Sequence, residues 1–323
     1  MQASQESAQH LKAGVLTGMQ RAPEVYSQGL NRYFMQANGQ LRKVSGLWEF
    51  LCTAVPSNKI KEIHTFFGKV PAVTEDGASP AGAAVPEYSF EVTNRNWSTS
   101  FSVDLYARDD DQTGDMALIG QSMMENFLYH RDQHVMATLS TTNTSTPVGY
   151  DGVSVINGSH VCGSTTRDND LATTLGEASF NAAYAAMEAF TDSQNQQPAL
   201  AVPTMIVTCP TLRPVAIQIA TSQTAPGGSA AWANAVGHVT NWVTQMSLDV
   251  LIVPMEFATT EWYLVDASKG FKPLILQDRM KPTIGMTQLS GDLAVIQNKI
   301  VFVGRTRITC AAGYWQYIIR GNA

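Results

Sequence analysis

The chain has 323 residues and a formal net charge of −6 at pH 7, a length that can bury a large core without disulfide or metal cross-links. Only 15% of the residues are charged, compared with roughly 25% in ordinary soluble domains, and charge depletion is typical of surfaces that become buried in protein contacts. The acidic balance excludes the overall basic character expected of a nucleic-acid-binding domain.

Residues 1–57 are predicted to form an N-terminal arm. Helical spacing in residues 11–33 is interrupted at Pro23, and residues 36–43 are polar. The alternative is a disordered terminus that folds back on its own domain. No apolar run here has signal-peptide length, and nowhere do about 18 apolar residues run together, so we expect a cytosolic chain with reduced thiols and no membrane span.

Residues 58–108 are predicted to form an extended loop with flanking strands. The stretch 66–86 is rich in Gly, Pro and Ala, and the strand-like stretches 88–93 and 101–107 follow it. A loop of this length is unusual inside a compact domain and is generally functional or a linker. We favour a projecting hairpin loop over a domain linker.

Residues 113–142 are predicted to form one long helix, the spine of a segment that spans residues 109–145. A helix of nearly thirty residues would be on the order of 42 Å long. The acids at positions 109–111 and 115 suit the helix N-terminus, where Asp111 or Thr113 can cap the first turn. The apolar residues that recur at helical spacing are Met116, Ile119, Met123 and Phe127, with a second row at Met124, Leu128, Val135 and Leu139.

The remaining residues mix helices and strands. Residues 143–176 contain many turn formers, and a helix is predicted over 177–191 with Phe180, Tyr184, Met187 and Phe190 on its buried face. We expect a strand over 200–209, a helix over 212–221, strands over 250–253, 261–265 and 272–277, and a closing pair of strands over 300–310 and 314–319. The pattern predicts an α+β chain.

No residue pattern supports an enzyme. The acidic run fails as a calcium loop because the required Glu is replaced by Gly120. His130 and His134 lie four residues apart but lack the H-E-x-x-H pattern, so a packed or interfacial pair is favoured over a metal site. His160 and Cys162 would point to opposite faces of a strand. We therefore predict no catalytic residue, cofactor site or metal site, with a metal-dependent hydrolase using residues 109–115 and the two histidines as the alternative.

Six short segments carry a further signal. They are APEVY at residues 22–26, FFGKVP at 66–71, RDD at 108–110, YDG at 150–152, WYLVDASKGFKPLILQDRMKP at 262–282 and GYWQ at 313–316. In this order they resemble the major head subunit family of Mu-like tailed phages. The segment at 262–282 is the most specific, because it is similar to the family's WYLLD, KPLI and RxKP elements in sequence and spacing. Residues 153–245 depart from the family pattern.

The resemblance implies a Hong Kong 97-type capsid fold. Its parts would be the arm at 1–57, the extended loop at 58–108, a peripheral domain with the spine helix at 109–145, an axial domain at 146–270, and C-terminal strands at 271–323 that return to the peripheral domain. The expected assembly contacts are Ala22, Pro23 and Tyr26 in the arm, Lys69, Pro71, Glu75, Pro80 and Pro86 in the loop, and Trp262 and Lys269 at the approach to the axial domain.

The implied function is that of a major capsid protein of a tailed double-stranded DNA phage. Copies of the chain would assemble into the hexamers and pentamers of an icosahedral head, in the virion, after assembly in the host cytoplasm. The expected partners are copies of the chain, portal and scaffold proteins, a decoration protein, and packaged DNA enclosed without sequence-specific binding; no membrane is expected. The alternative is another phage structural subunit, of a tail tube or a head decoration.

Overall fold

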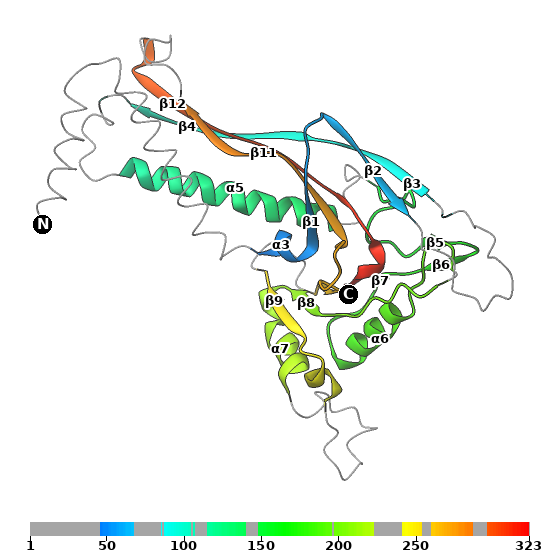
Figure 1. The fold of residues 1–323 in the computed structure, drawn as a ribbon. Coiled ribbons are helices and arrows are strands. Elements are labelled where there is room, and N and C mark those ends of the chain that lie inside the picture. The colour runs from blue at the N-terminus through cyan, green and yellow to red at the C-terminus, as the bar shows by residue number, and fades with distance from the viewer. Residues whose placement is uncertain are drawn as a thin grey trace, which may run out of the picture. The chain divides into compact units, whose positions relative to one another are not determined.

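The computed structural model describes residues 46–67, 85, 87–104, 106, 115–139, 148–195, 197–222, 241–253, 260–286 and 296–322 (Figure 1). These residues belong to two compact units. Unit 1 contains the described residues within 95–131 and 279–308, and unit 2 contains those within 47–94, 132–278 and 309–323. Each unit is therefore built from separated stretches of chain, whereas the segments predicted from the sequence are continuous.

The helices and strands follow the α+β prediction. The helices are α3 (Leu47–Leu51), α5 (Asp115–Leu139), α6 (Glu177–Glu188) and α7 (Arg213–Thr221), with 3₁₀ turns η1 (Pro210–Leu212), η2 (Trp242–Gln245) and η3 (Trp315–Tyr317). The strands are β1 (Cys52–Pro56), β2 (Lys61–Phe67), β3 (Glu87–Thr93), β4 (Arg95–Asp104), β5 (His160–Cys162), β6 (Thr165–Arg167), β7 (Asp170–Leu171), β8 (Met205–Thr208), β9 (Asp249–Ile252), β10 (Trp262–Val265), β11 (Leu274–Met286), β12 (Lys299–Ala312) and β13 (Ile318–Gly321).

Unit 1 is a helix packed on a sheet. Strand β4 pairs antiparallel with β12 along its whole length, from Lys299 opposite Asp104 to Ile308 opposite Arg95, and β11 is the next strand beyond β12. The buried face of α5 packs on this sheet through four side chains. They are Met123, Met124, Phe127 and Leu128, which contact Phe101 of β4 and Ile284 of β11.

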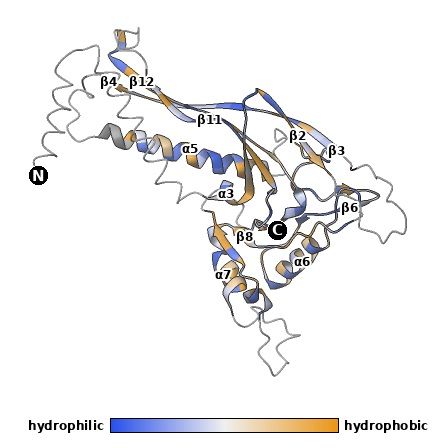
Figure 2. Ribbon diagram, in the orientation of Figure 1, coloured by the Kyte–Doolittle hydropathy of each residue, from blue (hydrophilic) through white to orange (hydrophobic). Residues whose placement is uncertain are grey.

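The structure confirms the predicted spine helix and most of its buried face. Helix α5 has 25 residues, and Figure 2 shows hydrophilic and hydrophobic residues along its length. Ile119, however, is 38% exposed, so its assignment to the buried face is wrong. The residue after it in the same row, Met123, is buried. Spacing alone identifies an apolar row but not how far the packed surface extends along it.

Unit 2 contains a five-stranded sheet with the order β7-β13-β10-β8-β9. Strands β8 and β10 are buried along their whole length, as expected for central strands covered on both faces. Helix α7 packs beside β8 and β9, and α6 packs beside β13. The predicted buried face of α6 is confirmed at Phe180, Tyr184 and Met187, and Phe190 is buried just beyond the end of the helix.

Three smaller pairings complete unit 2, and one of them joins β5 antiparallel to β6. Strand β1 lies parallel to the first five residues of β11, with Cys52 opposite Leu274. Strands β2 and β3 form an antiparallel hairpin from Lys61 opposite Thr93 to Phe67 opposite Glu87. The predicted loop between them lies at residues 68–86, almost all of which are outside the described residues.

The first strand of this hairpin differs from expectation. The predicted hairpin strands were 88–93 and 101–107, but β3 pairs with β2, and residues 101–104 belong to β4, which pairs with β12. Strand β2 was missed because its burial opposes its hydropathy. Ile63 and Phe67 are 70% and 60% exposed, whereas Glu62 and His64 lie on the half-buried face. An alternating pattern predicts the opposite orientation.

Two further expectations need correction. The stretches 300–310 and 314–319 do not pair with each other, because β12 lies between β11 and β4, while β13 lies between β10 and β7. Residues 47–56, assigned to the arm, form α3 and β1. Their side chains Leu47, Leu51 and Cys52 are buried in the main core of unit 2, since an apolar face on a short helix must pack against other elements.

Candidate assembly surfaces

Most of the predicted contact residues fall outside the described part of the chain. These are Ala22, Pro23, Tyr26, Lys69, Pro71, Glu75, Pro80 and Pro86, together with the acidic run at 109–111. Trp262 and Lys269, both in unit 2, are described. Their surroundings differ, and only one of them is available at the surface.

Trp262 is a core residue. Its side chain is fully buried at the start of β10, and its indole Nε1 donates a hydrogen bond to the carbonyl oxygen of Thr173 at 3.0 Å. A buried tryptophan with a satisfied N–H stabilises the sheet through its large apolar area. In the single chain, Trp262 therefore stabilises the sheet of unit 2 and presents no surface to a neighbouring molecule.

Lys269 lies on a tight turn that follows β10. Its ammonium is 3.8 Å from Oδ2 of Asp266, whose side chain is fully buried. The Asp266 carboxylate also accepts hydrogen bonds from the backbone N–H of Val202 at 2.9 Å and from the Ser268 hydroxyl at 2.6 Å. These bonds satisfy a buried charge. They fix the turn, and the Lys269 side chain is left partly exposed.

The same turn borders an aromatic groove of about 310 Å³. The other borders are the end of the β2–β3 hairpin next to residues 68–86 and the residues around η3. Phe66 lines the groove, with the Tyr150 ring stacked at 5.4 Å and the Tyr314 ring edge-on at 4.9 Å between centroids. Phe271, at the rim, is 68% exposed. The groove is also lined by Phe67, Tyr88, Asp192, Gln316 and Tyr317.

The exposed face of the β2–β3 hairpin continues this apolar surface. Ile63 and Phe67 project from it, opposite Glu91 and Glu87 on β3. Lys61 forms an ion pair with Glu91 at 2.5 Å. Exposed apolar side chains with charged neighbours are typical of protein contact sites. We call Ile63, Phe67 and Phe271 the hairpin patch.

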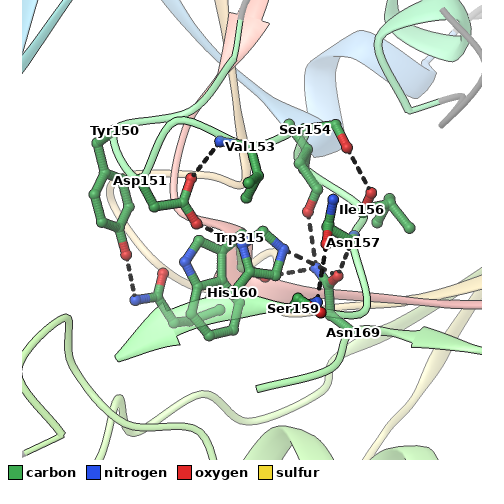
Figure 3. A network of polar contacts seen from close by, with 12 residues as sticks. Tyr150, Asp151, Val153, Ser154, Ile156, Asn157, Ser159, His160, Asn169 and Trp315 are labelled. Carbon is green, nitrogen blue, oxygen red and sulfur yellow. Dashed lines mark hydrogen bonds and ion pairs between the residues drawn. The ribbon is translucent and has the colours of Figure 1, made fainter. Parts of the chain in front are cut away.

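A buried polar network supports the loop that carries Tyr150 (Figure 3). His160, fully buried, stacks on Trp315 with 4.2 Å between ring centroids. Its Nδ1 lies 2.5 Å from Oδ2 of Asp151, and its Nε2 lies 3.1 Å from Oδ1 of Asn169. Oxygen atoms of two side chains therefore face the two ring nitrogens of this buried imidazole.

Asn169 is the centre of this network. Its Nδ2 faces the carbonyl oxygens of Val155 at 2.8 Å, Ile318 at 3.1 Å and Trp315 at 3.4 Å. Its Oδ1 accepts from the backbone N–H of Asn157 at 2.8 Å. One side chain thus connects the loop after residue 148 to the C-terminal strand, and the groove wall is held by the core beneath it.

The described residues of the hydrolase alternative do not form a metal site. His130 packs against Trp97 with 4.3 Å between ring centroids, and burial lowers the pKa of His130. No group of three or more His, Cys, Asp or Glu side chains that could hold a metal occurs among the described residues.

The four cysteines are all buried free thiols. They are Cys52, Cys162, Cys209 and Cys310, and burial raises the pKa of the Cys52 thiol. None of the described helices combines the length and apolarity needed to span a membrane.

The groove and the network were not found from the sequence. Their residues come from positions as distant as Phe66, Tyr150 and Tyr314, and no spacing rule connects such positions. A partial signal existed in two of the six resembling segments, because YDG at 150–152 and GYWQ at 313–316 contain Tyr150, Asp151, Tyr314 and Trp315.

Comparison with known proteins supplies an independent result. The model of a family described as phage capsid protein matches residues 97–319. The major capsid protein of Escherichia phage Mu is 34% identical over 64 residues, which are 20% of this chain and 21% of that protein. That match therefore spans about a fifth of the length of the relative.

Solved structures agree in fold. A chain from the procapsid of bacteriophage JBD30 has a TM-score of 0.50 at 17% identity, over 92% of this chain and 74% of that one. A chain from a virus-like particle of Pyrococcus furiosus has a TM-score of 0.51 at 12% identity, over 92% of this chain and 99% of that one. The predicted Hong Kong 97-type fold is confirmed. Because the family model covers more than half of the sequence and the fold agrees with it, this chain belongs to the phage capsid protein family.

Proposed function

We propose that this chain is the major capsid protein of a tailed double-stranded DNA phage. Copies of it assemble into the hexamers and pentamers of an icosahedral head that encloses the genome. The observation that carries the proposal is the match of the capsid family model to residues 97–319. The chain acts as a structural protein, without catalysing a reaction, and resides in the virion after assembly in the host cytoplasm.

The hairpin patch supports self-assembly. Ile63, Phe67 and Phe271 are all at least 60% exposed, and contact with a neighbouring copy would remove their apolar surface from water at roughly 25 cal/mol per Å². Such a contact between different surfaces of identical subunits is head-to-tail, and contacts of this kind close into rings. Portal and scaffold proteins during assembly, and a decoration protein on the head, are the further partners that we propose.

The test is negative-stain electron microscopy of the purified full chain over a range of concentrations. Closed shells are the expected result, and tubes would favour a tail subunit instead. The double variant Ile63→Asp/Phe67→Asp should stay folded, because both side chains are exposed, but should lose assembly.

The matched control is Leu200→Asp. Leu200 is 63% exposed and lies at a positive φ of 55°, a backbone conformation that Asp tolerates well. This variant should assemble normally. Equal loss of shells in the control and the double variant would contradict a specific role for the hairpin patch.

A further inference from the structure

One face of the unit 1 sheet concentrates positive charge. Side chains alternate between the two faces of a strand, and Gly304 of β12 faces α5, since a Cβ there would lie 2.5 Å from the Phe127 ring. The even-numbered positions of β12 therefore face the helix, and the odd-numbered positions face away from it. Lys299, Arg305 and Arg307 are on this outer face.

Strand β11 adds to the same face. Ile284 packs on the apolar cluster of α5, so the odd-numbered positions of β11 point away from the helix. These include Arg279, which is half-buried, and Lys281, which is exposed. We call Arg279, Lys281, Lys299, Arg305 and Arg307 the basic face. No ion pair connects these five cations with another described residue.

Strand β4 contributes small polar side chains. Residues that lie directly opposite each other in an antiparallel pair share a face, so Asn96, Ser98, Ser100 and Ser102 border the cations of β12. Asp104, opposite Lys299, is the acid of β4 on this face. Hydrophilic residues accordingly interrupt the hydrophobic ones along β4 and β12 (Figure 2). In a chain with 27 acidic and 21 basic residues, this local excess of positive charge is opposite in sign to the whole.

We infer that the basic face binds the phosphate backbone of double-stranded DNA without reading its sequence. Arg, Lys, Ser and Asn side chains are the groups that contact phosphates, and guanidinium groups bind phosphate oxygens through paired hydrogen bonds. Arg305 and Arg307 lie two residues apart, or roughly 7 Å along the strand. That spacing is similar to the rise along the DNA helix axis of about two phosphates of one strand, at about 3.4 Å each.

The composition of the face favours DNA over an acidic protein. Protein docking sites depend on aromatic or aliphatic anchors, and within unit 1 the apolar residues among the outward positions of β12 are two half-buried valines, Val301 and Val303. The inference rests on the proposed function, in which the chain encloses a DNA genome. It adds that one defined surface of the subunit contacts that DNA.

The test measures binding of the dilute, unassembled full chain to a labelled duplex DNA by fluorescence anisotropy at several salt concentrations. Affinity should fall linearly with salt on logarithmic axes, by a slope of about 0.9 for each phosphate contacted. In Arg305→Glu/Arg307→Glu, affinity at low salt should fall at least about tenfold and the slope by about 1.8, because two phosphate contacts are lost.

The control carries the same charge change on unit 2. Lys59→Glu/Arg213→Glu alters two exposed positions and should leave affinity within about twofold, since these sites lie outside the basic face. Arg305→Gln/Arg307→Gln, which adds no acid, should lose affinity in the same direction, and thermal unfolding will check that each variant folds.

Three results would overturn the inference. They are no salt-dependent binding by the unaltered chain, an equal loss in the control, or competition by polyglutamate as effective as competition by unlabelled duplex. Electron microscopy of the same samples separates the two proposals. Shells without DNA binding would overturn only the basic-face inference, whereas DNA binding without shells would contradict the proposed function.

Discussion

At the scale of single residues, a few buried polar side chains connect distant parts of unit 2. Asn169 donates toward three carbonyl groups and accepts from the backbone N–H of Asn157, and His160 lies between Asp151 and Asn169 (Figure 3). In a low-dielectric interior such a network is stabilising only when all its members are satisfied. Removal of its central member should therefore cost more than the loss of one average hydrogen bond.

The first prediction concerns that central residue. Asn169→Ala should lower the free energy of unfolding by about 3 kcal/mol or more, because several buried groups lose their partner at once. Urea denaturation provides the measurement. The control Asn157→Ala removes a side-chain oxygen that accepts from the exposed Ser159 N–H and should cost less than about 1 kcal/mol. Similar losses in the two variants would show that the network adds nothing.

The second prediction concerns pH. Burial lowers the pKa of His130 below its ordinary value of 6.5, so below about pH 6.5 the unfolded chain takes up a proton that the folded chain does not. Stability from this group is complete above pH 6.5 and decreases as pH falls toward the lowered pKa. In His130→Phe, which keeps a ring against Trp97, the unfolding temperature should fall less between pH 7 and pH 5.5.

The control for this prediction is Tyr129→Phe. Tyr129 is the exposed neighbour of His130 on α5, and a tyrosine does not titrate between pH 5.5 and pH 7. The control should therefore follow the unaltered chain over this range. A His130→Phe variant with the same pH dependence as the unaltered chain would show that His130 makes no contribution.

At the scale of elements, the packing of α5 on its sheet depends on one glycine. A Cβ on Gly304 would lie 2.5 Å from Cε2 of Phe127 and 2.8 Å from Sδ of Met123, distances that no real Cβ adopts without movement of its neighbours. The absent side chain lets the buried face of the helix approach the strand. The need for glycine at position 304 is apparent only from the packing of α5 against β12.

The third prediction tests this approach. Gly304→Ala should lower the free energy of unfolding by about 1 to 3 kcal/mol, the usual cost of overpacking a core. Gly285→Ala is the matched control on the neighbouring strand, where a Cβ would meet only the carbonyl oxygen of Val303 at 3.9 Å. The control should be neutral or slightly stabilising, because alanine loses less backbone entropy than glycine. Chemical denaturation of both variants separates crowding from the general effect of adding a methyl group.

At the scale of the whole molecule, the proposed function requires copies of the chain to form stable contacts with one another. Most of the loop predicted over residues 66–86 lies between β2 and β3, and two of the three residues of the hairpin patch, Ile63 and Phe67, lie on β2. A role of the loop in assembly stays a prediction, as do the arm contacts at Ala22, Pro23 and Tyr26. Both can be tested by changes that leave the described core intact.

The fourth prediction is that deletion of residues 71–85 leaves a soluble, folded subunit that no longer forms shells. The subunit should fold because the deletion removes no residue of β2 or β3. It should not assemble because the deletion removes the segment that we propose contacts a neighbouring subunit. Circular dichroism would report folding, and negative-stain microscopy would report assembly. Ser79→Ala, which keeps the loop length, should form normal shells. Normal heads from the deletion variant would exclude an assembly role for the loop.

The sequence by itself determined the elements that depend on local spacing. The buried faces of α5 and α6 were predicted at Met123, Phe127, Phe180 and Met187, because helical periodicity is set by residues three and four positions apart. The resembling segments likewise indicated the capsid fold that the comparisons confirmed. These signals reside in short stretches of chain.

Only the tertiary structure decided which strands pair and which face of each strand is buried. It joined β2 to β3 with Ile63 outward, separated β12 from β13, and placed Arg305 and Arg307 opposite Ser98 and Asn96 of β4. The physical reason is that strand pairing and burial depend on partners far away in sequence, so local hydropathy can oppose the final orientation. The aromatic groove, the Asn169 network and the basic face all arise at this level.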